Sequence, residues 1–217
     1  MRAFSLVEVV VTLGVLMVLV SFVLPTLRGA RDAAWLTRDS ASLRQCAALV
    51  AMYAAAASDR YPLGGNHPIV HADLWYRPVI AAGLATSPGE IDAFGMRRRG
   101  VVRFWQSACM NLAPDLMLPG QTRADWAGLA EAQRTTDVTY PSAKGHLFLA
   151  TNGEGTLSGG GQWFCCGPRW RSAVAMGDAS VRQGDYIEFN GGEPPVMVDY
   201  IGWPVYTTWG GIRGRDR

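Results

Sequence analysis

The feature that most limits how this chain can fold is an uninterrupted apolar run at its start. Residues Val9 to Leu24 include no charged side chain, and Phe4 to Val7 extend the run toward the N-terminus. About 21 residues in a helix that rises about 1.5 Å per residue span roughly 30 Å, the thickness of the hydrocarbon core of a bilayer. The sequence therefore predicts a membrane-spanning helix over residues 4–25.

Glu8 is the one ionisable residue inside this run. A carboxylate in hydrocarbon costs several kcal/mol unless it is paired. No cationic residue follows it before Arg28. We therefore expect the partner of Glu8 to be an amine that does not belong to the span itself.

The segment Phe4-Ser5-Leu6-Val7-Glu8 resembles the cleavage and methylation motif of type IV prepilins and of type II secretion pseudopilins. That motif has a short basic leader, then Phe, Thr or Ser, aliphatic residues and Glu at the start of an apolar helix. Gly14 and Pro25 also lie where many family members carry Gly and Pro. The chain departs from the family at Ala3, where the family prefers Gly, and in its short leader, residues 1–3.

The resemblance implies a processing site and an assembly site. Prepilin peptidase would cut between Ala3 and Phe4 on the cytoplasmic side, and the new amine of Phe4 would be N-methylated. Glu8 would neutralise that amine, within the subunit or on a neighbour, because a buried carboxylate is tolerated when it meets a buried ammonium. The implied partners are prepilin peptidase, other pilin or pseudopilin subunits, the inner-membrane assembly platform and the lipid bilayer.

Two other interpretations of the run are a generic signal anchor and a buried helix of a soluble protein. A secretory signal usually lacks an acidic residue such as Glu8 and ends in a small-x-small cleavage site. The stretch after Leu24, residues 25–31, matches that site poorly. The prepilin-like interpretation is the one that we favour.

Residues 26–57 continue the helix in an amphipathic form. The apolar positions recur at spacings of three, four and seven, which is the pattern of a helix with one buried face: Leu36, Leu43, Ala47, Val50 and Ala54. The charged residues are expected on the remaining face: Arg28, Arg31, Asp32, Arg38, Asp39 and Arg44. Pro25 would kink the helix, and residues 58–62 would end it.

Residues 58–144 are rich in Pro, Gly and Trp, and the sequence predicts an irregular region with short helices near 74–84 and 123–132. His67 and His71 are spaced like helical metal ligands, but Pro68 lies between them. Ordinary loop histidines are therefore expected rather than a metal site.

From residue 145 the pattern changes to short strands. The predicted strands are 146–151, 162–166, 172–176, 179–183 and 186–189, with a possible edge at 197–203, and Gly177-Asp178 predicts a tight hairpin turn. The fold class that follows is α+β, and the resemblance implies that it is pilin-like. A long N-terminal helix, membrane-spanning in its first half, would pack on a small, mostly antiparallel sheet within 145–217.

A second, partial resemblance lies in the stretch from Val174 to Arg182. It is similar to the hairpin of a pseudopilin-like group that carries Asp-Gly-Ser-Val-Arg, with Ala179 in place of the Gly. Some pseudopilins bind calcium in a C-terminal loop, and the acidic residues in candidate loops are Glu154, Asp178, Asp185 and Glu193. No pattern matches, so no cofactor is expected, and calcium stays an alternative.

The remaining composition limits the partners. The net charge of +2 gives no indication of nucleic acid binding. The four cysteines, Cys46, Cys109, Cys165 and Cys166, allow three disulfide connectivities. No catalytic motif is present.

We expect a non-enzymatic filament subunit, single-pass in the inner membrane with an extracytoplasmic C-terminal domain. The alternative is a membrane-anchored extracytoplasmic binding domain or enzyme.

Overall fold

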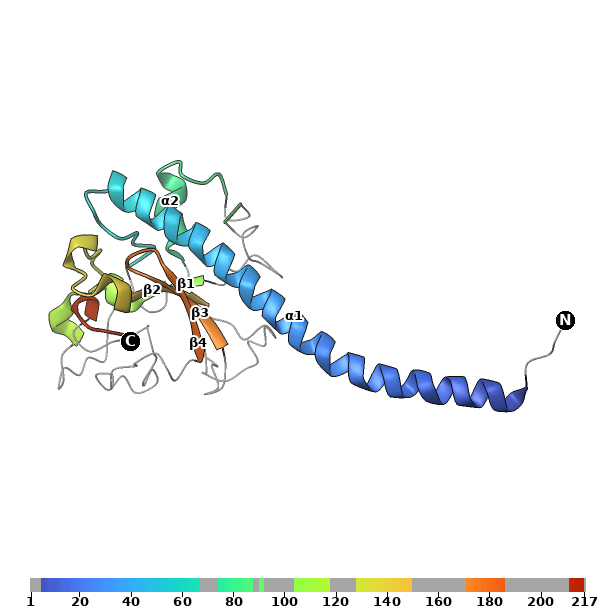
Figure 1. Cartoon of the computed structure of the whole chain (residues 1–217). Coiled ribbons are helices and arrows are strands. Elements are labelled where there is room, and N and C mark those ends of the chain that lie inside the picture. Colours follow the sequence, from blue (N-terminus) through green and yellow to red (C-terminus); the bar gives the residue numbers. More distant parts are fainter. Residues whose placement is uncertain are drawn as a thin grey trace. The chain divides into compact units, whose positions relative to one another are not determined.

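The computed structural model of the chain describes residues 5–66, 74–87, 90–91, 104–117, 128–149, 171–185 and 211–216. The chain divides into two compact units, Met1–Arg38 and Asp39–Arg217. Helix α1 (Leu6–Ala56) runs through both units (Figure 1). We call the second unit the head.

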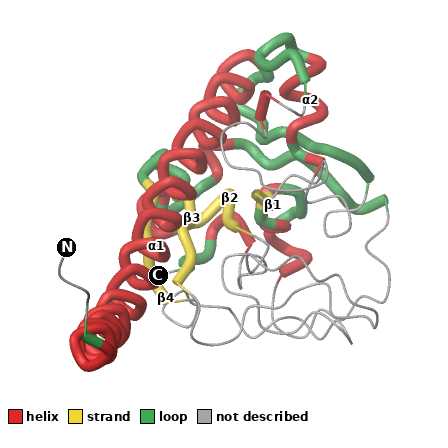
Figure 2. The backbone as a smooth tube through the Cα atoms, turned by 90° about the vertical axis from the view of Figure 1, so that its right-hand side faces the viewer, coloured by secondary structure: helices red, strands yellow, loops and turns green. Residues whose placement is uncertain are grey.

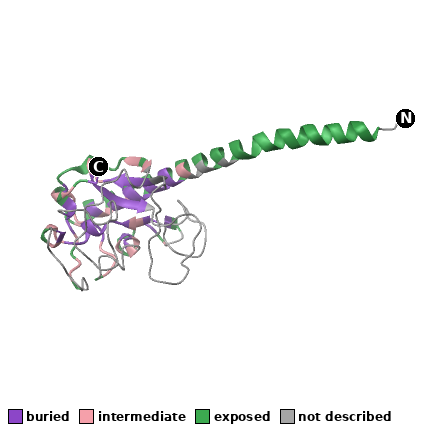
Figure 3. Ribbon diagram, turned by 90° about the horizontal axis from the view of Figure 1, so that it is seen from below, coloured by how far each residue is buried: buried purple, intermediate pink, exposed green. Residues whose placement is uncertain are grey.

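The first unit is the N-terminal part of α1. The helix is continuous through Pro25, as its residue range requires. The large apolar side chains between Leu6 and Leu27 are 45% to 80% exposed within the chain. The helix is long and apolar enough to cross a membrane, and Figure 3 shows its N-terminal part as exposed.

The part of α1 in the head has one buried face, as the sequence predicted. Leu43, Ala47, Val50 and Ala54 are each at most 3% exposed, whereas Arg44 lies on the exposed face. The periodicity therefore identifies the packing face correctly. Three polar residues at the start of this part are also buried, namely Asp39, Ser40 and Ser42. The prediction that Asp39 lies on the exposed face is wrong.

Four strands form one antiparallel sheet in the order β1-β2-β3-β4 (Figures 1 and 2). They are β1 (Phe104–Gln106), β2 (Gly145–Leu149), β3 (Arg171–Met176) and β4 (Val181–Asp185). With α1 they make the fold α+β. The predicted strand at 172–176 is confirmed as β3, and the one predicted at 146–151 is confirmed as β2 over its described residues, 146–149. The strand predicted at 179–183 begins two residues later.

The helix lies on one face of the sheet. The side-chain amide of Gln183 in β4 donates to Ser40 Oγ of α1 over 2.6 Å. Gln183 pairs with Ala173, so period-two alternation places Ala173, Ala175 and Leu147 on the same face, and all three are fully buried. The small alanine side chains allow the helix to approach the sheet closely. Figure 2 shows α1 running alongside β3.

The hairpin between β3 and β4 turns at Gly177, Asp178 and Ala179. The amide of Met176 donates to the carbonyl of Ser180, and Ala179 has a φ of +64°. A three-residue turn of this kind ends in a left-handed residue, a position that favours glycine. The tight turn predicted at Gly177-Asp178 is confirmed, with Ala179 as the strained residue.

Strand β1 comes from the region predicted to be irregular. Its three residues carry no periodic signal, and they pair with β2 some forty residues later in the chain. The indole N–H of Trp75 donates to the carbonyl of Phe104 over 2.8 Å and fastens the segment before helix α2 (Tyr76–Ala81) to β1. Helix α2 confirms the short helix predicted near 74–84.

The rest of the described head consists of loops, turns and short 3-10 helices, namely η2 (Ala108–Met110), η3 (Pro114–Met117), η4 (Thr135–Asp137), η5 (Pro141–Ala143) and η7 (Gly211–Arg213). Several predicted elements lie outside the described residues: the strands at 162–166, 186–189 and 197–203, and the first half of the helix at 123–132. The pair His67 and His71 also lies outside them. The prediction of a helix is wrong for residues 128–132, which form a turn and an extended segment.

Candidate functional site

The candidate site is the first turn of α1, where the resemblance places its assembly residue. Ala3 and Phe4 lie outside the described residues, and Glu8 lies in the first turn of the helix. The backbone N–H of Ser5 donates to Glu8 Oε2 over 2.9 Å. The N–H of Val7 donates to Ser5 Oγ over 3.4 Å. The Glu8 carboxylate therefore has a partner inside its own helix.

These two contacts form a variant of the capping box, in which the Ser5 hydroxyl accepts from the N–H of Val7, the second helical residue, instead of the third. Helix α1 begins at Leu6, so Ser5 is the N-cap residue and Glu8 is the third helical residue. The two side chains reciprocally satisfy backbone N–H groups that have no partner within the helix, and the negative charge lies at the positive end of the helix dipole. The Ser-x-x-Glu spacing was readable in the sequence, but its capping role was not recognised there.

The apolar surface that follows carries few polar groups, and these bond to the helix backbone. Thr12 Oγ1 donates to the carbonyl of Glu8, Ser21 Oγ to that of Val18, and Thr26 Oγ1 to that of Val23, at 2.7 to 2.8 Å. Hydroxyls satisfied in this way can face hydrocarbon at little cost. Between Val9 and Leu27 the surface of α1 is thus chemically compatible with lipid.

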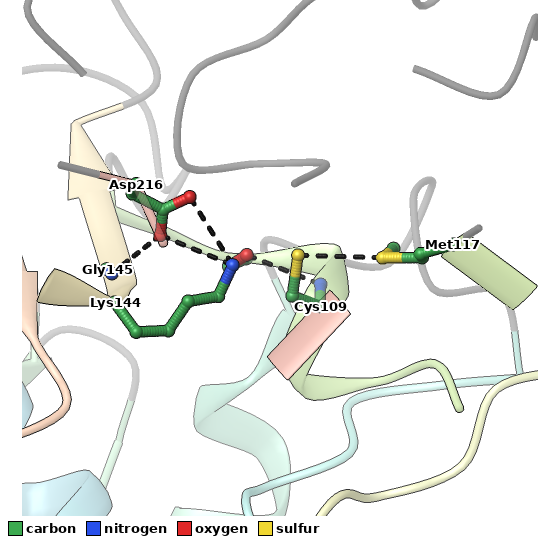
Figure 4. A network of polar contacts seen from close by, with 6 residues as sticks. Cys109, Met117, Lys144, Gly145 and Asp216 are labelled. Carbon is green, nitrogen blue, oxygen red and sulfur yellow. Dashed lines mark hydrogen bonds and ion pairs between the residues drawn. The ribbon is translucent and has the colours of Figure 1, made fainter. Parts of the chain in front are cut away.

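A second polar network lies in the head and was not predicted from the sequence (Figure 4). Lys144 Nζ lies 3.3 Å from Asp216 Oδ2, and both side chains are fully buried. Gly145 N–H donates to the same carboxylate oxygen over 2.8 Å. Burial by itself lowers the pKa of Lys144, but Asp216 and Cys109 together outweigh it and raise the pKa. The lysine is therefore held as a buried cation.

The sulfur atoms beside this pair are buried as well. Cys109 Sγ lies 3.6 Å from Met117 Sδ, and Figure 4 shows Cys109 between Lys144 and Met117. Cys46 is also buried in the head. Cys165 and Cys166 lie outside the described residues, so the three connectivities stay open.

The acidic residues considered for calcium are not brought together in the described part of the head. Asp178 Oδ1 accepts from the N–H and the hydroxyl of Ser180 at 3.0 and 2.6 Å, as a turn-forming aspartate does. Partial burial raises the pKa of Asp178, but the hydrogen bonds from Ser180 and the charge of Arg182 together outweigh this effect and lower the pKa. Glu154 and Glu193 lie outside the described residues. Among those described, no three His, Cys, Asp or Glu side chains are arranged for a metal ion.

Compared with known protein families, with curated proteins and with solved structures, the chain matches none. The resemblance to prepilins therefore rests on the motif at the start of α1 and on the α+β arrangement.

Proposed function

We propose that the chain is a pilin-type or pseudopilin-type subunit of a type IV pilus or type II secretion system. It is inserted into the cytoplasmic membrane through α1 with its head outside, and is then incorporated into a helical filament. The observation that carries this proposal is the motif Phe4-Ser5-Leu6-Val7-Glu8 at the start of a continuous 51-residue helix whose first part is apolar.

The exposure of the apolar side chains supports the proposal. Between Leu6 and Leu27 about half or more of each large apolar side chain has no protein contact within the chain. Moving one such side chain from water into an apolar environment is favourable by roughly 1.5–3 kcal/mol. Lipid would cover this surface before assembly, and the helices of neighbouring subunits would cover it afterwards.

The capping box supports a specific role for Glu8. The Ser5 N–H already holds the Glu8 carboxylate at the N-terminal end of α1. Cleavage before Phe4 would create an ammonium one residue away from that N–H. A carboxylate so positioned can pair with this ammonium or with that of a neighbouring subunit, and the pairing would set the register of subunits in the filament.

The first test is the mass and N-terminal peptide of the full chain recovered from membranes. We expect a mature chain that begins with N-methylated Phe4. A chain that still begins at Met1, in cells whose prepilin peptidase processes other substrates, would contradict the proposal. The protein would then be an anchored extracytoplasmic domain, in which the capping box gives Glu8 a purely local role.

Two matched variants separate the charge of Glu8 from its capping role. Glu8→Gln removes the charge, yet glutamine also serves in a capping box. Ser5→Ala removes the hydroxyl acceptor and keeps the charge. We expect Glu8→Gln to insert into the membrane but to be lost from the filament fraction, while Ser5→Ala is incorporated. Normal incorporation of Glu8→Gln would refute the pairing.

A further inference from the structure

The chain leaves α1 through a strained turn. Ser58 and Asp59 follow the helix with φ angles of 55° and 59°. The left-handed region is unfavourable for residues with a side chain, and two such residues in succession persist only where the surroundings hold them. We call residues 57–61 the latch turn.

The latch turn is held by the segment 132–135. The N–H of Tyr61 donates to the carbonyl of Gln133 over 2.9 Å, and the N–H of Thr135 donates to the carbonyl of Asp59 over 2.7 Å. Arg60 Nη1 donates to the carbonyl of Ala132 over 3.0 Å. These contacts fasten the end of α1 to a segment more than seventy residues later in the chain.

Tyr61 anchors the latch turn in the core, where it meets His146 of β2. Tyr61 and His146 are 3% and 4% exposed, and their ring centroids lie 5.9 Å apart with a tilt of 48°. His146 Nδ1 is buried and has no hydrogen-bond partner. A protonated imidazole has two N–H donors that need acceptors, so a charged His146 requires water that Tyr61 and its neighbours exclude.

The ionisable groups around His146 do not compensate for its burial. Burial lowers the pKa of His146 to about 4, and the opposing effect of Asp178, from the β3–β4 turn, is smaller. Tyr61 stays neutral, because burial raises its pKa. Lys144, two residues before His146, is a buried cation paired with Asp216 and offers no negative charge to an imidazolium.

We propose that residues 57–61 are an acid-released latch: protonation of His146 displaces Tyr61, and the strained turn at Ser58 and Asp59 then relaxes away from segment 132–135. The device does not depend on the proposed filament function, since it belongs to the head alone. It would let an acidic medium loosen the connection between the end of α1 and the sheet while β3 and β4 stay paired.

The pH range over which the latch opens follows from the pKa of the His146 imidazole in the closed and open states. In the closed latch His146 takes a proton near pH 4, and in the open latch near its ordinary value of 6.5. The stabilisation of the closed latch by a neutral His146 is therefore fully present above pH 6.5 and is lost as the pH falls toward 4. Between pH 7 and 4.5 the ratio of open to closed latch should rise roughly 50-fold.

The test is amide hydrogen exchange of the full chain in detergent micelles at pH 7 and 4.5, corrected for the intrinsic effect of pH. We expect roughly 50-fold greater opening in peptides that cover 57–61 and 132–135, with the strands 171–185 unchanged. His146→Gln and His146→Phe should remove this pH dependence. His67→Gln and His71→Gln, which remove the other two histidines, should keep it.

Three outcomes would overturn the proposal: no increase at pH 4.5, an increase that persists in both His146 variants, or equal loss of protection in the strands. One further variant tests the strain and does not alter the core. Asp59→Gly removes a side chain from a left-handed position, so the latch peptides should be better protected at pH 4.5 than in the wild type. Unchanged or weaker protection would contradict the role of strain.

Discussion

The buried pair of Lys144 and Asp216 supports a quantitative prediction about the stability of the head. Asp216→Asn keeps the shape of the side chain and its acceptor for the Gly145 N–H, but it removes the charge that faces Lys144. Breaking a buried ion pair by removing one partner costs about 3–5 kcal/mol. That is a large fraction of the roughly 5–15 kcal/mol by which a domain is stable.

The cost should arise from the unpaired ammonium rather than from a lost favourable contact. Burial lowers the pKa of Lys144, and Asp216 is the first of the groups that oppose this effect. Without Asp216 the lysine must lose its proton or remain charged in the core. Lys144→Met together with Asp216→Asn removes both charges, and a buried pair replaced in this way is often nearly neutral. We expect the double variant to lie within about 2 kcal/mol of the wild type.

The assay is equilibrium unfolding of the full chain in mild detergent by urea, followed by tryptophan fluorescence, for which the fully buried Trp75 is a reporter. Asp115→Asn, at an exposed carboxylate, is the matched control and should change stability by less than about 0.5 kcal/mol. The reasoning would be refuted if Asp216→Asn behaved like this control. It would also be refuted if the double variant cost as much as the two single variants added together.

Three further predictions concern the packing of the head and can be measured in the same unfolding assay. Ala179→Gly should stabilise the head by roughly 0.5–1 kcal/mol because it relieves a left-handed φ of +64°, and a loss of stability would contradict the strain. Leu43→Ala should cost about 2–5 kcal/mol, because the leucine side chain is fully buried. Met52→Ala should cost less than about 0.5 kcal/mol, because the methionine is 53% exposed. Equal costs would contradict the packing of α1. Gly64→Ala should cost about 1–3 kcal/mol, because a Cβ there would lie 2.4 Å from the backbone of Leu74; an unchanged midpoint would show that this contact relaxes freely.

The local pattern of the sequence determined the long helix and its two chemical halves. An uncharged run of this length can satisfy its backbone in hydrocarbon only as a helix. The spacing of Leu43, Ala47, Val50 and Ala54 selected the face that is buried in the head. The hairpin of β3 and β4 was equally readable, because a turn signal separated two short strands.

Tertiary structure decided the features that join distant segments. Strand β1 is three residues long and exists because β2 pairs with it, which no local pattern indicates. Lys144 and Asp216 are 72 residues apart in the chain, and each reads alone as an ordinary surface charge. Only the folded head places both charges in a medium from which water is excluded, where each requires the other.

The N-terminal site lies between these two cases. The sequence was sufficient to select Glu8 and to predict that its carboxylate needs a partner, because charge is costly in hydrocarbon. The structure supplied a partner that had not been considered, the N–H of Ser5 three residues earlier. Sequence thus determines which groups need compensation, and the folded backbone decides what provides it, since a hydrogen bond depends on the position of both atoms.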